Sequence, residues 1–230
     1  QSEEVEKVIE NAAAQTNSRL FRADFESIKL KDFGLDGQIF DYSTFTDLST
    51  KLLGRHQLKN AAVAITACQV LKEKVDCITD DTIRKGIAKA QWKGRMELVC
   101  KNPIFFIDGA HNEDGVNVLT NTLTEYFPQK RKIFIMGVLK DKEYSKMVKT
   151  VAQIADKFYT VTPLSERALP SRELADIIKM HCNNVVVCDK IVEGINKAIE
   201  EAEENDIICA FGSLYYIGEV RQYFENFLKG

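Results

Sequence analysis

Three polar side chains follow one another closely after a short apolar segment in the middle of the chain. Ile104–Ile107 has the composition of a buried strand, and Asp108, His111 and Asn112 come directly after it. Gly109 permits a sharp turn, and Asn112 is a suitable N-cap for a helix that begins at the next residue. Such a turn lies where the carboxyl edge of a sheet meets a helix N-terminus, which is where open α/β sheets bind ligands. An acid, an imidazole and an amide at that place are able to hold a nucleotide sugar, a metal or an amine.

A purely structural role for the same turn is the alternative. Aspartate and asparagine commonly satisfy turns and helix caps, and Asp108 and Asn112 could do no more than that. His111 favours the ligand-binding interpretation, because a histidine at a sheet edge is poor core material and is well suited to a site.

A second polar group opens a helix nearer the N-terminus. His56, Gln57 and Asn60 are expected on the first turn of a helix that ends at about Leu71, where unpaired backbone N–H groups favour anions and hydrogen-bond acceptors. The residues that follow are apolar on most sides of the helix, so we expect it to be buried. A capped and buried helix start without a ligand explains these residues equally well.

Two further side chains suit a phosphate or a substrate. Arg95 lies in the segment 91–95, which we expect to be a hinge between domains, and the fork geometry of its guanidinium matches phosphate. A surface ion pair is the alternative for Arg95. Ser213 follows Gly212 at the end of the last expected strand, where it either faces a ligand or caps the final helix.

The motifs around these residues resemble those of one enzyme family. Residues 94–97, Gly-Arg-Met-Glu, and residues 106–112, Phe-Ile-Asp-Gly-Ala-His-Asn, are similar to the signature of the folylpolyglutamate synthase and dihydrofolate synthase family, which belongs to the Mur ligase superfamily. Further stretches are similar to motifs of that family: Gly-x-His-Gln-x-x-Asn-Ala-x-x-Ala at 54–64, Gly-x-x-x-Asp-Lys at 137–142, Arg-Ala-Leu-Pro at 167–170 and Gly-Ser-Leu-Tyr at 212–215. Together they cover nearly the whole chain, but only the C-terminal half of a typical member.

The resemblance implies an ATP-dependent amide ligase that adds L-glutamate to folates through an acyl phosphate. Whether dihydropteroate is also a substrate stays open, as do the roles of the charged residues 140–142 and of Arg167. The resemblance further implies that Asn60, Arg95 and Asp108 bind ATP, with Asp108 on a ribose hydroxyl. It implies that His111 and Ser213 are the catalytic residues, which help to place glutamate or to close the domains.

One component of such an enzyme is missing from the sequence. No G-x-x-x-x-G-K-[ST] motif occurs, so the chain cannot cradle the phosphates of ATP with a P-loop. The resemblance implies that an upstream ATPase part supplies the P-loop and the Mg²⁺ ligands, and we expect the chain alone to be inactive. Glu113 departs from the family, where Pro is common, but an acid suits a helix N-terminus and the turn is expected to survive.

Composition excludes several other classes of protein. The 230 residues are 45% apolar and 28% charged, with a net charge of −3, and no basic block suggests a nucleic-acid partner. No apolar run is long enough to span a membrane, and the acidic start resembles no signal peptide. The six cysteines form no C-x-x-C pair, which argues against a zinc site. We expect a monomer in a reducing cytoplasm.

Two parts of the chain differ in pattern. From residue 97 onward strands alternate with helices, which predicts a Rossmann-like, mostly parallel sheet with helices on both faces. We assign 93–230 to a C-terminal glutamate-ligase domain and 1–92 to the last part of a central ATPase domain. The latter is expected to have helices over 2–14 and 83–90, the second capped by residues 80–82, and strands in antiparallel hairpins over 19–25, 27–30, 38–42 and 48–53.

Two other functions are compatible with the residues. One is a Mur-type ligase that acts on a muramyl peptide, although the motifs at 54–64 and 212–215 favour folate. The other is a non-catalytic module that binds a nucleotide or glutamate.

Overall fold

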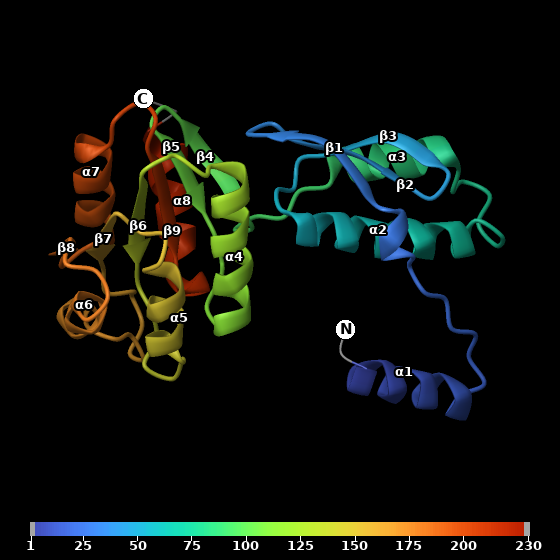
Figure 1. The fold of residues 1–230 in the computed structure, drawn as a ribbon, viewed down its shortest axis with the longest axis horizontal. Coiled ribbons are helices and arrows are strands. Elements are labelled where there is room, and N and C mark those ends of the chain that lie inside the picture. Colours follow the sequence, from blue (N-terminus) through green and yellow to red (C-terminus); the bar gives the residue numbers. More distant parts are fainter. Residues whose placement is uncertain (1–2, 228–230) are drawn as a thin grey trace. The chain divides into compact units, whose positions relative to one another are not determined.

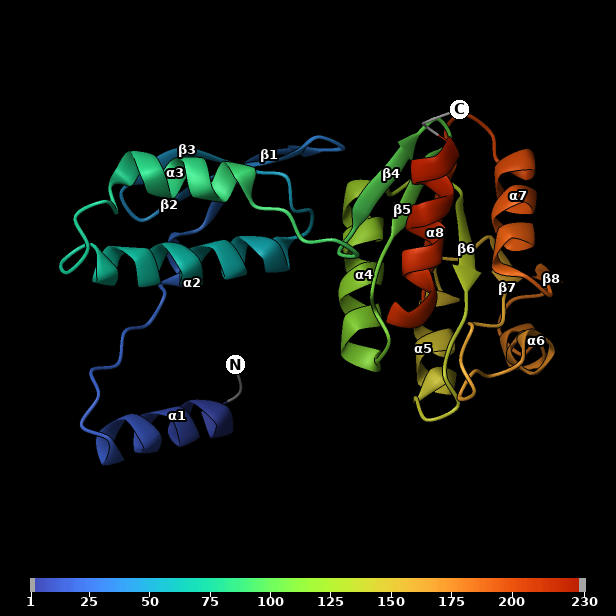
Figure 2. The same cartoon turned by 180° about the vertical axis from the view of Figure 1, so that it is seen from behind.

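The computed structural model describes residues 3–227, which form two compact units (Figures 1 and 2). Of the described residues, 3–32, 38–50 and 56–90 belong to the N-terminal unit, and 33–37, 51–55 and 91–227 belong to the C-terminal unit. Each unit has its own apolar core, and the two are described separately. Among the described residues no helix combines the length and the apolar character that crossing a membrane requires.

The C-terminal unit is built on a six-stranded sheet. Its strands lie in the order β4-β5-β9-β6-β7-β8, and every neighbouring pair is parallel except β4 and β5. The bounds are β4 Glu97–Lys101, β5 Ile104–Ile107, β6 Lys132–Met136, β7 Lys157–Thr160, β8 Val185–Val187 and β9 Ile207–Phe211. The mostly parallel α/β fold expected from the sequence is confirmed.

Helices cover both faces of this sheet. Helices α4 (Glu113–Tyr126), α5 (Tyr144–Val151) and α6 (Ser171–Lys179) contribute to one core, and α7 (Ile191–Glu201) and α8 (Leu214–Phe227) contribute to the other. Successive strand residues point to opposite faces, so the central strands are apolar throughout. Figure 1 shows α4 and α5 in front of the sheet, and Figure 2 shows α7 and α8 in front of its other face.

The strand order creates a crevice at one edge of the sheet. The last strand, β9, lies between β5 and β6 in the sheet, although β6 is the strand that follows β5 along the chain. Helix α4, which follows β5, therefore packs on one face of the sheet, and α8, which follows β9, packs on the other. Ligands bind in open α/β sheets at such a reversal, outside the carboxyl ends of the strands.

The N-terminal unit combines a three-stranded sheet with helices. Its elements are α1 (Glu3–Gln15), a 3₁₀ turn at Phe25–Ser27, β1 (Lys29–Gly34), β2 (Gly37–Tyr42), β3 (Phe45–Thr50), α2 (Arg55–Leu71) and α3 (Asp80–Lys89). The last residues of β1 and the first of β2 and α2 belong to the C-terminal unit by the division above. Strand β2 pairs with β3 in antiparallel fashion, and one face of this hairpin packs with α2 and α3 around a small core that includes Phe40, Leu48, Ile65 and Ile83.

Three expectations for the N-terminal unit were wrong in detail. The segment Arg19–Phe25 forms no strand, and a 3₁₀ turn capped by Asp24 begins at its last residue. The expected strand over 48–53 is instead β3, which ends at Thr50. The N-cap of α3 is Thr79, whose hydroxyl accepts from the N–H of Thr82 in a capping box.

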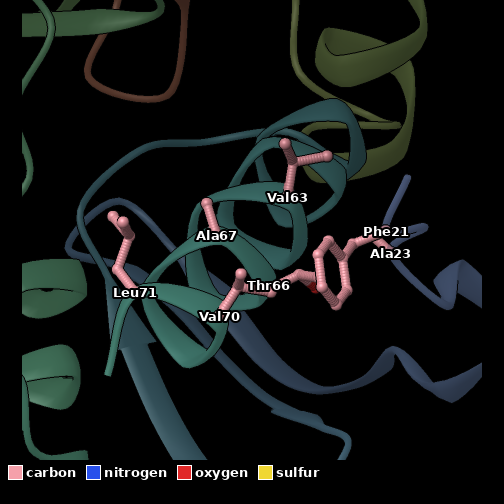
Figure 3. A pocket seen from close by; sticks show the side chains of 7 residues that line it. All are labelled: Phe21, Ala23, Val63, Thr66, Ala67, Val70 and Leu71. Atoms are coloured by element: carbon pink, nitrogen blue, oxygen red, sulfur yellow. The ribbon is translucent and has the colours of Figure 1, made fainter. Parts of the chain in front are cut away.

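Helix α2 differs from its prediction in a more informative way. Leu58, Ala62 and Ile65 are buried, but Val63 is 52% exposed and Leu71 is 47% exposed (Figure 3). The helix is therefore buried on one side only, although its sequence is apolar on most sides.

Candidate functional site

Asp108 is the central residue of the turn that follows β5. One carboxylate oxygen, Oδ2, accepts from the N–H of Met96 at 2.7 Å, and the other, Oδ1, accepts from the N–H of Ala110 at 2.8 Å. The residue is only 7% exposed. Asp108 therefore connects the start of β4 to the turn after β5, and each oxygen keeps a further lone pair.

Burial also changes the acidity of this carboxyl group. Desolvation raises the pKa of Asp108 above its ordinary value, because it disfavours the charged form. The two backbone N–H groups and the positive charge of Arg95 act in the opposite direction, but burial has the larger effect.

Arg95 is packed closely against the same turn. The Gly109 N–H donates to the Gly94 carbonyl oxygen at 2.7 Å, and Arg95 Nη1 donates to that oxygen at 3.1 Å. A Cβ atom on Gly109 would lie 2.3 Å from Arg95 Nη1 and 2.6 Å from Leu214 Cδ2. A side chain at position 109 would therefore displace the guanidinium, and the structure brings together Arg95 and Asp108, two of the residues that the sequence singled out.

A partly buried ion pair supports the backbone beside Arg95. Arg221 on α8 donates to Glu97 on β4 through both Nε and Nη2, at 3.0 and 2.6 Å, and Glu97 Oε2 accepts from the Gly94 N–H at 2.5 Å. Burial acts to raise the pKa of Glu97, but the hydrogen bonds from Arg221 and Gly94 outweigh it and the pKa is lowered. Sequence analysis missed this pair, since its members are far apart in the sequence.

His111 and Ser213 line one cavity of about 220 Å³ at the carboxyl edge of the sheet. The loops that follow β5, β6, β7 and β9 all contribute to its wall, which also contains Lys142, Arg167 and Tyr215. His111 Nδ1 lies 2.8 Å from the Gly109 carbonyl oxygen, and because a carbonyl oxygen only accepts, Nδ1 is the donor in this hydrogen bond. The imidazole is therefore oriented by the backbone of its own turn.

Ser213 has a structural partner within this wall. Its Oγ accepts from the N–H of Tyr215 at 3.2 Å in the first turn of α8, and the residue is 2% exposed. The helix-capping alternative therefore describes the observed contact of its hydroxyl. Gly212 before it has a φ of +117°, and a Cβ atom there would lie 2.6 Å from the Gly137 carbonyl oxygen.

The cavity also contains cationic groups for which the sequence predicted no role. Arg167 Nη2 donates to the Tyr215 hydroxyl at 2.9 Å, and Arg167 Nη1 lies 3.6 Å from Asp141. Lys142 Nζ lies 3.5 Å from the same Asp141 carboxylate. Their positions in the loops that follow β6 and β7 were the available signal, because strand-end loops of a parallel sheet meet at one edge.

Asn60 belongs to the N-terminal unit. It lies in the first two turns of α2, it is exposed, and its Nδ2 donates to Gln57 Oε1 at 3.0 Å. Gln57 itself is buried, so this bond holds the Asn60 amide against the surface of the helix.

No metal centre is evident in the part of the chain that the structure describes, since residues 3–227 contain no group of three or more His, Cys, Asp or Glu side chains able to hold an ion. The side chains with charge for an anionic ligand are Arg95, at the turn after β5, and Lys142 and Arg167, at the cavity. The arrangement suits a ligand with phosphate or carboxylate groups.

Comparison with known proteins gives a consistent result. The family model described as Mur ligase, glutamate ligase domain, matches residues 94–214. The dihydrofolate synthase/folylpolyglutamate synthase of Bacillus subtilis is 34% identical over 81% of this chain and 44% of its own length. The crystal structure of a folylpolyglutamate synthase from Thermotoga maritima has a TM-score of 0.83 and 28% identity, over 98% of this chain and 52% of that one.

A third comparison concerns the fold alone. The Mycobacterium tuberculosis folylpolyglutamate synthase, solved in complex with ADP and AMPPCP, has a TM-score of 0.84 at 22% identity, over 97% of this chain and 53% of that one. The chain thus spans about half the length of the relatives that it matches.

Proposed function

Because this chain belongs to the Mur ligase family through its glutamate ligase domain, we propose that it is one half of an ATP-dependent amide ligase that adds L-glutamate to folates. The observation that carries the proposal is the cavity at the carboxyl ends of β5, β6, β7 and β9, beside the turn that holds Arg95 against Gly109. This site has fixed cations for anionic ligands and an oriented imidazole, and the similar B. subtilis protein is named for the same activity.

The chemistry requires an activated substrate. A carboxylate does not react with an amine under mild conditions, and bound ATP would supply the phosphoryl group that turns the folate carboxylate into an acyl phosphate. The amine of glutamate then attacks the acyl carbon, the C–O bond to phosphate breaks, and phosphate leaves as the amide forms. The contribution of this chain is positioning and charge stabilisation.

Three residues are assigned to ATP. Arg95 offers its guanidinium to a phosphate from a backbone position that Glu97 and Gly94 fix. Asp108 accepts a ribose hydroxyl through the lone pairs that its two backbone bonds leave. Asn60 offers an exposed amide to the adenine end.

The cavity is assigned to glutamate. His111 is assigned to the amine of glutamate, and Lys142 and Arg167 are suited to its carboxylates. Ser213 shapes the wall by capping α8. Its oxygen accepts a hydrogen bond in this cap, which leaves its hydroxyl proton to donate to glutamate.

The remaining components are assigned outside this chain. Mg²⁺ ligands and a P-loop are expected in the half of the relatives that the chain does not cover. The substrates are a folate and L-glutamate, and the assignment is to a cytoplasmic, monomeric enzyme with the segment 91–95 as the hinge for closure.

A chimaera tests the proposal. In it, this chain replaces the aligned part of the B. subtilis relative, and the purified protein is incubated with tetrahydrofolate, ATP, Mg²⁺ and glutamate before mass spectrometry. We expect glutamylated folate from the chimaera and from the parent enzyme, and none from the 230-residue chain alone. A folded chimaera without product would overturn the proposal, and product from a muramyl peptide and an amino acid instead would assign the chain to the other branch of the family.

The assignment of Arg95 has its own test. Arg95→Ala in the chimaera should lower kcat/KM for ATP about 100-fold, because a charged donor aimed at a phosphate is lost. Lys93→Ala is the matched control, since Lys93 is an exposed cation in the same segment, and it should leave kcat/KM unchanged. A value for Arg95→Ala equal to that of the control would contradict the role.

A further inference from the structure

The segment that joins α3 to β4 changes character at a single peptide bond. Residues 91–93 are exposed to solvent. Gly94 and Met96 are buried, and Arg95 between them is half-buried. The exposed part of the linker therefore ends at Lys93, and the residue assigned to a phosphate of ATP lies beyond it.

The backbone on both sides of Arg95 is held by hydrogen bonds. The Gly94 N–H donates to Glu97 Oε2 at 2.5 Å, and the Gly94 carbonyl oxygen accepts from the Gly109 N–H at 2.7 Å. The Met96 N–H donates to Asp108 Oδ2 at 2.7 Å. Met96 has a φ of +40°, which residues other than glycine rarely adopt and which persists only where surrounding contacts hold it. The backbone from Gly94 to Met96 is thus fixed to the C-terminal unit.

Helix α8 supports this backbone through a charged and an apolar contact. Arg221 donates to Glu97 through Nε and Nη2 at 3.0 and 2.6 Å, and the two side chains are only 19% and 24% exposed. Ile217 lies one turn earlier on the same face of α8. Its Cδ1 approaches Gly94 so closely that a Cβ atom there would lie 2.7 Å away. We call the Glu97–Arg221 pair with its bond to Gly94 the linker clamp.

The linker clamp determines how Arg95 is held. Both chain neighbours of Arg95 are fixed, and its own Nη1 donates to the Gly94 carbonyl oxygen at 3.1 Å. Bending of the exposed residues 91–93 therefore leaves the guanidinium in place beside the turn after β5. Such precision matters, because misplacement of a catalytic or binding group by about 1 Å can cost about 100-fold in rate.

We propose that Arg221, acting through Glu97, is the residue that positions Arg95 for a phosphate of ATP, and that the hinge is confined to residues 91–93. The inference rests on the proposed function. Arg221 has no contact with the nucleotide in this proposal, so it is a positioning residue. An ion pair that only stabilised the unit would affect Arg95 no more than any other part of the site, and this difference is measurable.

The first test is the hydrogen exchange of single amides in the full 230-residue chain, followed by NMR. The Gly94 and Met96 amides should exchange about tenfold more slowly than those of residues 92–93, because they are buried and hydrogen-bonded. Arg221→Met removes both donors to Glu97, whose unpaired carboxylate then turns toward water. The Gly94 amide should then exchange about tenfold faster, while the amides of β9 keep their rates.

Arg131→Met is the matched control for this substitution. Arg131 also bonds to carboxylates of the C-terminal unit, namely Glu201 on α7 and Asp206 before β9, and its loss should leave the Gly94 exchange rate unchanged. Arg221→Lys keeps the charge but has a single donor nitrogen, so an intermediate rate is expected. It takes the place of Arg221→Met if circular dichroism shows that the latter does not fold.

The second test uses the kinetics of the chimaera described above. Arg221→Met should lower kcat/KM for ATP about tenfold, and Arg95→Ala should lower it about 100-fold. The double variant should equal Arg95→Ala alone, because a positioning residue has no effect once the group that it positions is gone. Arg131→Met should leave kcat/KM unchanged.

The outcomes separate the linker clamp from the function. A Gly94 amide that exchanges as fast as those of residues 92–93, or that Arg221→Met does not accelerate, would overturn the clamp. Losses of kcat/KM that add in the double variant, or an equal loss from Arg131→Met, would overturn the positioning role of Arg221. A Gly94 amide released by Arg221→Met, together with a folded chimaera that makes no glutamylated folate, would uphold the clamp and reject the function.

Discussion

The two units of this chain use apolar residues in contrasting ways. In the C-terminal unit both faces of the sheet are covered, so Phe105 and Phe106 are fully buried on opposite sides of β5. In the N-terminal unit α2 is covered on one side, and Val63 on its other side is 52% exposed. The C-terminal unit therefore has a complete core, with the cavity at its strand ends. The N-terminal unit instead exposes a helix face with the apolar residues typical of a core.

The largest expected effect tests whether the strand-end turns of the C-terminal unit are rigidly specified. Gly212→Ala places a Cβ atom 2.6 Å from the Gly137 carbonyl oxygen at a φ of +117°, which is a backbone region that alanine rarely adopts. We expect the free energy of unfolding of this unit to fall by about 3 kcal/mol or more in denaturant titrations.

Gly218→Ala is the control for that substitution. Gly218 lies within α8 and a Cβ atom there would meet nothing within 4 Å, so this change should raise stability by about 0.5–1 kcal/mol. Equal stabilities of the two variants would show that the turn after β9 tolerates a side chain and is not preorganised.

An intermediate effect is expected from a buried hydroxyl that ties α8 to the sheet. The Tyr216 hydroxyl lies 2.8 Å from the Ile135 carbonyl oxygen and 2.5 Å from that of Phe211, in a fully buried position. Tyr216→Phe should cost about 1–2 kcal/mol of unfolding free energy, since a buried carbonyl loses its donor. Tyr223→Phe removes an exposed hydroxyl from the same helix and should cost about 0.5 kcal/mol or less; a similar loss for both would contradict the argument.

The smallest effect concerns how the stability of the C-terminal unit depends on pH through Glu201, the last residue of α7. Burial acts to raise the pKa of Glu201, but hydrogen bonds from Lys157, Tyr159 and Arg131 outweigh it and lower the pKa to about 2. Because the folded pKa is below the ordinary value of 4.5, this stabilisation is present above pH 4.5 and is lost as the pH falls toward 2. Glu201→Gln should therefore flatten the loss of stability between pH 4.5 and 2, and a slope unchanged from the parent chain would refute this account.

Sequence patterns predicted the C-terminal unit better than the N-terminal one, for physical reasons. The strand Ile104–Ile107 was predicted with the right bounds, because a fully buried strand is a continuous apolar run. The cap by Asn112 was also predicted, since its hydrogen bond to Gly115 is local. By contrast, Arg19–Phe25 has the alternation of a strand, but none of its residues belongs to one.

The site was predicted in part. Asp108 and His111 were selected because a strand-end turn is visible in the sequence, and Arg95 was selected because its guanidinium suits phosphate and lies in the expected hinge. Two other features were not predicted: the two hydrogen bonds that the Asp108 carboxylate accepts, and the Glu97–Arg221 ion pair. Both join residues that only the folded sheet brings together. The roles of the five predicted site residues remain proposals.

Hydrogen exchange followed by mass spectrometry tests the contrast between the two units most directly. In the chain alone we expect slow exchange in β5, β6 and β9 and faster exchange in residues 61–71 of α2, because the complete core opens less often than the half-covered one. Exchange in 61–71 that is as slow as in β9 would contradict the account.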